Sequence, residues 1–179
     1  HGTCRRQRQM CIRDRMDSPP DIVPLLKDAQ SQPCINHDED VDITRTDWHM
    51  GNDFTRPWVK VFMPHLVYHL EQYIKPFHAF MIQDIWFQQY DNGSQHGWHT
   101  HSHNFTGVYY VTHPTSHTEL IEPYTQKAIT LPVKHNDVVV FPSTTIHRAP
   151  PASNKIIISF NFNAFYHYKV DNSSNNGYN

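Results

Sequence analysis

The feature that most constrains the fold is a series of short β-type segments in the second half of the chain. After Pro76, segments rich in Val, Ile, Phe, Tyr and Trp alternate with turns that contain Gly, Asn, Pro and Ser. These segments are Phe80–Tyr90, Phe105–Val111, Ala128–Val133, Asp137–Phe141 and Lys155–Phe165. Short strands at this spacing are typical of an antiparallel sandwich or barrel. The sequence therefore predicts a β core at about residues 80–166.

One helix is expected to flank this core. Apolar residues between Pro57 and Ile74 recur with a helical period and form a single stripe, which predicts a supporting helix at about residues 57–75. Pro64 lies inside it and predicts a kink or a restart. Further upstream, the short apolar pieces Ile22–Leu26 and Val41–Ile43 are expected to be short strands or turns at the edge of the core.

The length of 179 residues predicts a single domain, which we place at residues 17–170. Residues 1–16 have no strand or helix period, and the string QRQMCIRDR resembles a translated sequencing adapter. We therefore expect this segment to be non-native or disordered, with Met16 close to the true start. The polar residues 171–179 are expected to form a disordered tail.

Composition and charge exclude several classes of protein. No apolar run approaches the length needed to cross a bilayer, and no signal-like N-terminal segment is present, so a membrane protein is not expected. The balance of 15 Lys and Arg against 17 Asp and Glu gives a net charge of −2, which makes a nucleic-acid partner a poor match. Three cysteines, Cys4, Cys11 and Cys34, do not form a disulfide framework. A cytoplasmic, reducing location is expected.

Histidines are the feature that most directly indicates chemistry, because the chain has 15 of them and they cluster. In the segment QHGWHTHSHN, His99, His101 and His103 alternate, so on a strand they would share one face. Two of them could bind a metal together with His147, which follows the apolar segment Asp137–Phe141. Three protein ligands on one face leave positions open, as in non-haem Fe(II) oxygenases. Alternating histidines can equally form the solvent face of an edge strand.

Residues from about 47 to 163 resemble the 2-oxoglutarate- and Fe(II)-dependent oxygenases of bacteria and phages. The resemblance rests on four pieces in the correct order: Trp86–Tyr90 (WFQQY), Trp98–Val111 (WHTHSHNFTGVYYV), Asn136–His147 (NDVVVFPSTTIH) and Lys155–Asn161 (KIIISFN). It implies a mainly β fold with a flanking helix, that is, an α+β protein built on a double-stranded β-helix (jelly roll, cupin-like). It also implies an oxidoreductase that uses Fe(II), 2-oxoglutarate and dioxygen, with ascorbate as reductant, to hydroxylate a substrate.

The resemblance implies that His99, His101 and His147 are the iron ligands, with His103 as a substitute for His101. The commoner pattern of this superfamily has a carboxylate where His101 stands. Three neutral imidazoles would leave an Fe(II) site at +2 and a carboxylate would lower it to +1, so the site should hold anionic 2-oxoglutarate tightly but be harder to oxidise. A three-histidine thiol dioxygenase-like enzyme therefore stays an alternative.

The cosubstrate site shows a second departure, because Lys155 stands where the family usually has arginine. Lysine can pair with the distal carboxylate of 2-oxoglutarate, but as a point charge and not as a planar fork. On a strand, Lys155 shares a face with Ser159, which could donate a further hydrogen bond. A buried Tyr90 or Tyr110 hydroxyl could also reach the cosubstrate, and all four residues are candidates for binding it.

Other side chains receive more modest roles. Trp86 and Gln88 share a face with Tyr90 and are expected to line the pocket mouth or the core, whereas Arg148 should point away from His147. Asn136 is expected to adopt a left-handed turn conformation. The remaining histidines near strand ends, His113, His117, His135 and His167, are expected to lie on the surface.

The substrate itself is not encoded in a readable motif. A small molecule or a peptide is expected, with a homodimer left open. The alternative from another class is a non-catalytic jelly-roll module, such as a virion or sugar-binding protein, which would need neither Fe(II) nor 2-oxoglutarate.

Overall fold

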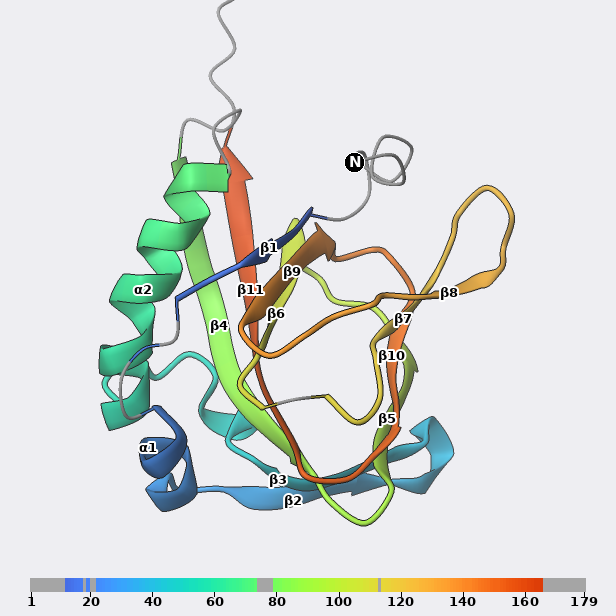
Figure 1. The fold of residues 1–179 in the computed structure, drawn as a ribbon, viewed down its shortest axis with the longest axis horizontal. Helices are drawn as coiled ribbons and strands as arrows, with labels where there is room; N and C mark the ends of the chain where they lie inside the picture. Colours follow the sequence, from blue (N-terminus) through green and yellow to red (C-terminus); the bar gives the residue numbers. More distant parts are fainter. Residues whose placement is uncertain (1–11, 18, 20–21, 74–78, 113, 166–179) are drawn as a thin grey trace, which may run out of the picture.

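The computed structural model describes residues 12–17, 19, 22–73, 79–112 and 114–165 (Figure 1). Two α-helices pack on one side of a curled sheet. The helices are α1 (Ile22–Asp28) and α2 (Pro57–Tyr73), and the short 3-10 helices are η1 (His37–Glu39) and η2 (Trp48–Met50). The strands are β1 (Ile12–Arg15), β2 (Gln32–Asn36), β3 (Val41–Thr46), β4 (Ala79–Tyr90), β5 (Ser94–His99), β6 (Phe105–Tyr110), β7 (Glu119–Ile121), β8 (Ala128–Thr130), β9 (Asp137–Pro142), β10 (His147–Ala152) and β11 (Lys155–Phe165).

The sheet is antiparallel at every strand pair of the described chain and follows the order β1-β9-β6-β11-β4-β3-β5-β10-β7-β8, with β2 paired to β3. The long strands β4 and β11 form its spine, and the sheet curls so that β5 and β10 face β6 and β9 across the interior (Figure 1). This arrangement confirms the predicted mainly β jelly roll with a flanking helix. The five predicted segments all contain strands.

Strand β11 separates two cores, because successive side chains of a strand point to opposite faces. Ile158, Phe160 and Phe162 belong to the outer core, which α2 covers with its apolar stripe. That stripe consists of Trp58, Val59, Phe62, Leu66 and Leu70, each at most 1% exposed. On the other face, Ile157 joins the inner core inside the curl. The inner core continues directly into the candidate site.

The helical elements differ from the sequence-based expectation in two places. Helix α2 runs through Pro64 as one element without the restart that was one of the two expectations, because its buried stripe packs continuously on the sheet and outweighs the hydrogen bond that a proline removes. Ile22–Leu26 was expected to be a strand or turn, but it lies in α1, where Pro24 occupies the first turn and needs no N–H partner. Val41–Ile43 lies in a strand, as expected. Ile74 and Pro76 lie outside the described residues.

The N-terminal segment also departs from expectation. Residues Ile12–Arg15 form β1 and pair with Asp137–Val140 of β9, and Met16 is 2% exposed in the outer core. Residues 12–16 are therefore not disordered, because the free edge of β9 offers them a backbone partner, whereas a non-native origin of residues 1–16 stays a prediction. Residues 1–11 and the expected tail at 171–179 lie outside the described part of the chain.

Strand β10 contains Pro150 and Pro151, yet it pairs with both β5 and β7. Its register with β5 shifts twice, and prolines are tolerated at such irregularities because the ladder hydrogen bonds are interrupted there. Asn136 has a φ of 68°, which confirms the predicted left-handed turn before β9. Within the described residues, neither helix has the length and apolar content to span a membrane.

Candidate metal centre

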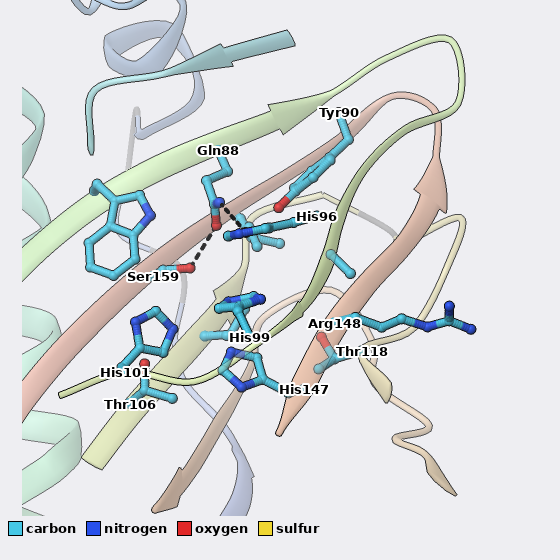
Figure 2. Close-up of a pocket in the computed structure, with 14 residues that line it drawn as sticks. Gln88, Tyr90, His96, His99, His101, Thr106, Thr118, His147, Arg148 and Ser159 are labelled. Atoms are coloured by element: carbon cyan, nitrogen blue, oxygen red, sulfur yellow. Dashed lines mark hydrogen bonds between the residues drawn. The ribbon is translucent and has the colours of Figure 1, made fainter. Parts of the chain in front are cut away.

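Three histidines converge inside the curl of the sheet (Figure 2). His99 ends β5, His147 begins β10, and the two are register partners on adjacent strands. His101 lies in the loop that follows β5, where its backbone N–H donates a 2.9 Å hydrogen bond to the carbonyl of Ser143. One ring nitrogen from each histidine lies within 4.8 Å of the others, which is a spacing that one metal ion can span. The three predicted ligands are thus brought together, and metal binding by them stays a prediction.

Backbone carbonyls orient two of the three rings. Nδ1 of His99 donates to the carbonyl of Gly97 at 2.7 Å, and Nδ1 of His147 donates to the carbonyl of Thr145 at 2.9 Å. A carbonyl only accepts hydrogen bonds, so each Nδ1 carries the proton and each Nε2 keeps a free lone pair. Such a second hydrogen bond is typical of histidines that bind metals. His101 is held differently, with its ring against Trp86 at a centroid distance of 5.9 Å.

The site favours neutral imidazoles. Burial lowers the pKa of all three histidines. Burial, with a smaller contribution from repulsion by His99, lowers the pKa of His101 to about 4 and of His147 to about 2. Neutral imidazole is the form that binds a metal, so the ligands need not lose protons near neutral pH.

His103 lies apart from this triad. Strand β5 ends at His99, so the expected continuous strand through residues 99–103 is not formed, and the chain turns away after His101. Nε2 of His103 contacts a carboxylate oxygen of Asp84 at 2.9 Å. The structure therefore pairs His103 with Asp84 and leaves the triad to the other three histidines.

A fourth histidine at the site, His96, was not identified from the sequence. Its ring stacks on that of His99 with centroids 3.7 Å apart, and its Nδ1 lies 3.5 Å from the side-chain nitrogen of Gln88. Simple alternation would place residues 96 and 99 on opposite faces. The pairing of β5 with β10 contains an extra residue between them, and this bulge turns both rings to the same side. The signal in the sequence is Gly97, which makes room for the bulge.

Lys155 lies fully buried near the Tyr90 end of the cavity. Its Nζ has no hydrogen-bond partner in the described chain and lies over the rings of Tyr90 and Tyr110, at 5.3 and 6.0 Å from their centroids. Burial lowers the pKa of Lys155 to about 8. The expected inward orientation is what the structure shows, and a buried, unpaired ammonium calls for an anion.

The other candidates for cosubstrate binding have mixed positions. Ser159 lines the cavity, but its hydroxyl donates to the side-chain oxygen of Gln88 at 3.0 Å. Tyr90 lines the cavity as well, and burial raises the pKa of its hydroxyl. The Tyr110 hydroxyl is hydrogen-bonded to the Thr118 hydroxyl and does not line the cavity.

Arg148 extends away from the histidines, as predicted (Figure 2). Its Nε donates to Glu119 at 2.7 Å, and its guanidinium lies 4.6 Å from the ring of Trp98. The predicted wall of Trp86, Gln88 and Tyr90 does line the cavity. Among the histidines expected on the surface, His117 and His135 are half-buried, and His113 and His167 lie outside the described residues.

Comparison with known proteins gives matches in structure but not in sequence. No family model and no curated protein matches the chain. Among solved structures, a 2OG-Fe(II) oxygenase family oxidoreductase from Burkholderia pseudomallei superposes with a TM-score of 0.64 at 11% identity, over 79% of this chain and 76% of that one. The viral collagen prolyl hydroxylase of Paramecium bursaria Chlorella virus-1 gives a TM-score of 0.57 at 13% identity, over 90% and 98%. The chain has the fold of the 2OG-Fe(II) oxygenases.

This fold carries more than one reaction. The non-haem α-ketoglutarate-dependent epimerase SnoN of nogalamycin biosynthesis superposes with a TM-score of 0.64 at 11% identity, over 98% of this chain and 89% of that one. A hydroxylase and an epimerase thus share the oxygenase fold, so the fold alone does not specify the reaction. The chemistry has to be argued from the residues of the site.

Proposed function

We propose that this protein is a non-haem Fe(II) oxygenase that uses 2-oxoglutarate and dioxygen to hydroxylate a small-molecule or peptide substrate. The observation that carries the proposal is the histidine triad, His99, His101 and His147, gathered inside a jelly roll of the oxygenase type. Three protein ligands leave open positions on a metal ion, which oxygen-activating chemistry requires. Iron bound there would supply the oxidative decarboxylation of 2-oxoglutarate to succinate and carbon dioxide, coupled to hydroxylation.

The residues of this chain fit both groups. The Nε2 atoms of His99 and His147 are left free by the backbone hydrogen bonds at Nδ1, so they can serve as ligands. Lys155 supplies a buried cation without a hydrogen-bond partner in the described chain, which suits the distal carboxylate of 2-oxoglutarate. Its ammonium would fix the far end of the dicarboxylate while the apolar wall, including Ile157, keeps water away.

The cavity at this end is narrow. About 30 Å³ is free between the triad and the Tyr90 end, which is room for two or three water molecules. Lys155 does not line this space, whereas Tyr90 does. A dicarboxylate that reaches Lys155 must therefore displace side chains, and Tyr90 is the one whose ring lies next to the ammonium.

The thiol dioxygenase-like alternative is favoured by one specific observation. No carboxylate of the described residues joins the triad, since Asp84 is paired with His103 and Asn161 instead. Three histidines do not by themselves require a 2-oxo acid as a further ligand of the metal. A substrate thiol could therefore supply the additional donor atom to the metal.

Oxygen uptake and succinate formation separate these functions. The full chain is supplied with Fe(II) and ascorbate and a panel of amino acids, peptides, nucleosides and thiols, with and without 2-oxoglutarate. The proposal expects succinate in proportion to 2-oxoglutarate consumed. In Lys155→Ala, the KM for 2-oxoglutarate should rise by about 30-fold or more with little change in metal affinity, since removing one partner of a buried charge pair costs at least 2 kcal/mol. Oxygen uptake with a thiol alone would support the alternative, and no iron-dependent turnover would favour a binding module.

A further inference from the structure

Two larger cavities adjoin the triad, and Lys155 lines neither of them. One has a volume of about 390 Å³ and is walled by Val41, Ile43 and Trp86. The other has a volume of about 550 Å³ and lies against Asp84 and His103. Both cavities reach His101, and both are lined by Trp48 and Thr100. They therefore form neighbouring compartments that share one candidate metal ligand in their lining.

Trp48 stands where the two compartments meet. It belongs to the short helix η2, and 63% of its surface is exposed although it is a large apolar residue. An exposed indole beside a cavity offers a flat surface for an apolar chain and an electron-rich face for a cation. The position indicates contact with a ligand that extends out of the cavity.

Apart from histidines, the charged side chains around these compartments are acidic. Glu39 is the charged residue among the described lining residues of the first cavity, and Asp84 is the carboxylate of the second. Neither lining includes a lysine or arginine from the described chain. The buried cation Lys155 lines neither cavity and lies over the rings of Tyr90 and Tyr110. The cation and the carboxylate of the first cavity are thus separate, and the Glu39 side is the acidic end of the site.

Glu39 is held close to the candidate ligands by direct packing. A Cβ atom added to Gly97 of β5 would lie 2.4 Å from the carbonyl oxygen of Glu39, so the two backbones touch. The Glu39 side chain is exposed and lines the same cavity as His99 and His101. The adjacent Asp38, Asp40 and Asp42 are exposed, and none of these carboxylates pairs with a lysine or arginine in the described residues.

We propose that the substrate is a cationic amine, with its alkylammonium group against Glu39 and its hydrocarbon part across Trp48. This inference rests on the proposed function, since it names the substrate class of the same site. The opposite charges would direct each ligand to its own part of the site. The dianionic cosubstrate is attracted to Lys155 and repelled by Glu39, whereas the cationic amine is attracted to Glu39 and repelled by Lys155. A lysine side chain has this chemistry, either as the free amino acid or within a peptide.

Binding can be tested without turnover. Probes are three acetylated, amidated tripeptides with lysine, norleucine or glutamate between two alanines, and free lysine as a fourth. Each is titrated into the full chain, and binding is followed by tryptophan fluorescence and calorimetry. The lysine peptide should bind about 10-fold or more tightly than the norleucine and glutamate peptides, and the difference should shrink with added salt. Preference for free lysine over the peptide would identify a small-molecule substrate of the same class.

Variants assign the effect to the acidic end. Glu39→Gln should weaken binding of the lysine peptide by about 5- to 10-fold, and Trp48→Ala by a similar factor, whereas Trp48→Phe should retain part of it. Glu71→Gln is the matched control, because Glu71 is an exposed carboxylate on α2, remote from both cavities. Equal binding of all three peptides, or unchanged binding in Glu39→Gln, would overturn the inference. If succinate forms but the protein does not prefer amines, the inferred substrate class is wrong and the proposed function stands. If the protein binds amines but does not turn over 2-oxoglutarate, the proposed function is wrong and the inferred ligand class stands.

Discussion

At the scale of single residues, His147 is the most constrained member of the triad. It is 5% exposed, its Nδ1 donates to the Thr145 carbonyl, and it is the ligand contributed by the adjacent strand β10. We expect His147→Ala to lower the affinity for Co(II) or Fe(II) by at least about 100-fold, because two remaining imidazoles make a weak site. Calorimetric titration of the full chain measures this.

His103→Ala is the matched control for that change. Its ring nitrogen is paired with Asp84 at 2.9 Å, outside the triad, so we expect metal affinity within about threefold of the parent protein. An equal loss in both variants would show that the ligand set has been assigned wrongly.

Lys155 links the site to stability through pH. The pKa of Lys155 is about 8 in the folded protein against 10.5 for an ordinary lysine, which corresponds to a cost of about 3 kcal/mol when the side chain is charged. Between these two values the unfolded chain binds a proton that the folded protein has lost, so stability rises with pH. Below pH 8 the full cost applies.

Lys155→Met should therefore be more stable than the parent by about 1–3 kcal/mol at pH 7 without 2-oxoglutarate, and this advantage should disappear by about pH 10.5. Urea unfolding at pH 7 and pH 10 measures the free energy of unfolding of both proteins. Other titrating groups are common to the two proteins, so their contributions cancel in the difference. An advantage that does not depend on pH would mean that the lysine is not buried as a cation.

At the scale of elements, the bulge in β5 decides the shape of the site. It places His96 and His99 on one face and brings Gly97 against the backbone of Glu39. A methyl group at residue 97 would meet a carbonyl oxygen at 2.4 Å, and backbone cannot move aside as a side chain can.

Gly97→Ala should thus lower the free energy of unfolding by about 1–3 kcal/mol and weaken metal binding as well. Gly51→Ala is a useful comparison, since its closest contact would be 3.2 Å and its φ of −53° suits any residue. Denaturant unfolding and metal titration of both variants check the prediction. If the two substitutions cost the same, the close packing of β5 on Glu39 is not required.

At the scale of the whole molecule, the triad joins two neighbouring strands that lie far apart in the sequence. His99 and His101 come from β5 and the loop after it, and His147 comes from β10, which lies between β5 and β7. A metal bound there would cross-link them in the folded state alone. Ligands that bind only the folded state stabilise it by mass action.

A redox-inert ion such as Zn(II), at about 100 times its Kd, should raise the stability by about 2.7 kcal/mol and the Tm by about 5–10 °C. Thermal unfolding of the full chain with zinc, and again after EDTA, measures the shift. The shift should vanish in His147→Ala and persist in His103→Ala. An unchanged Tm in the parent protein would argue against a metal centre.

The sequence alone predicted those features that depend on local patterns. Alternation along Lys155–Phe165 predicted an inward lysine, and the helical period from Pro57 predicted the stripe that covers the sheet. The spacing of β-type segments predicted an antiparallel sandwich or barrel, and the resemblance to the oxygenases implied the jelly roll. The position of His147 after an apolar strand predicted its place near His99.

Tertiary structure decided whatever depends on register and non-local pairing. The bulge in β5 brought His96 to the site, and the end of that strand sent His103 to Asp84. Likewise, β1 and the proline-containing β10 exist because neighbouring strands offer unpaired backbone edges. Local sequence specifies which face a side chain takes within one strand, but one extra residue reverses that face. Whether the extra residue is accommodated is set by the energy of pairing with strands far away in the chain.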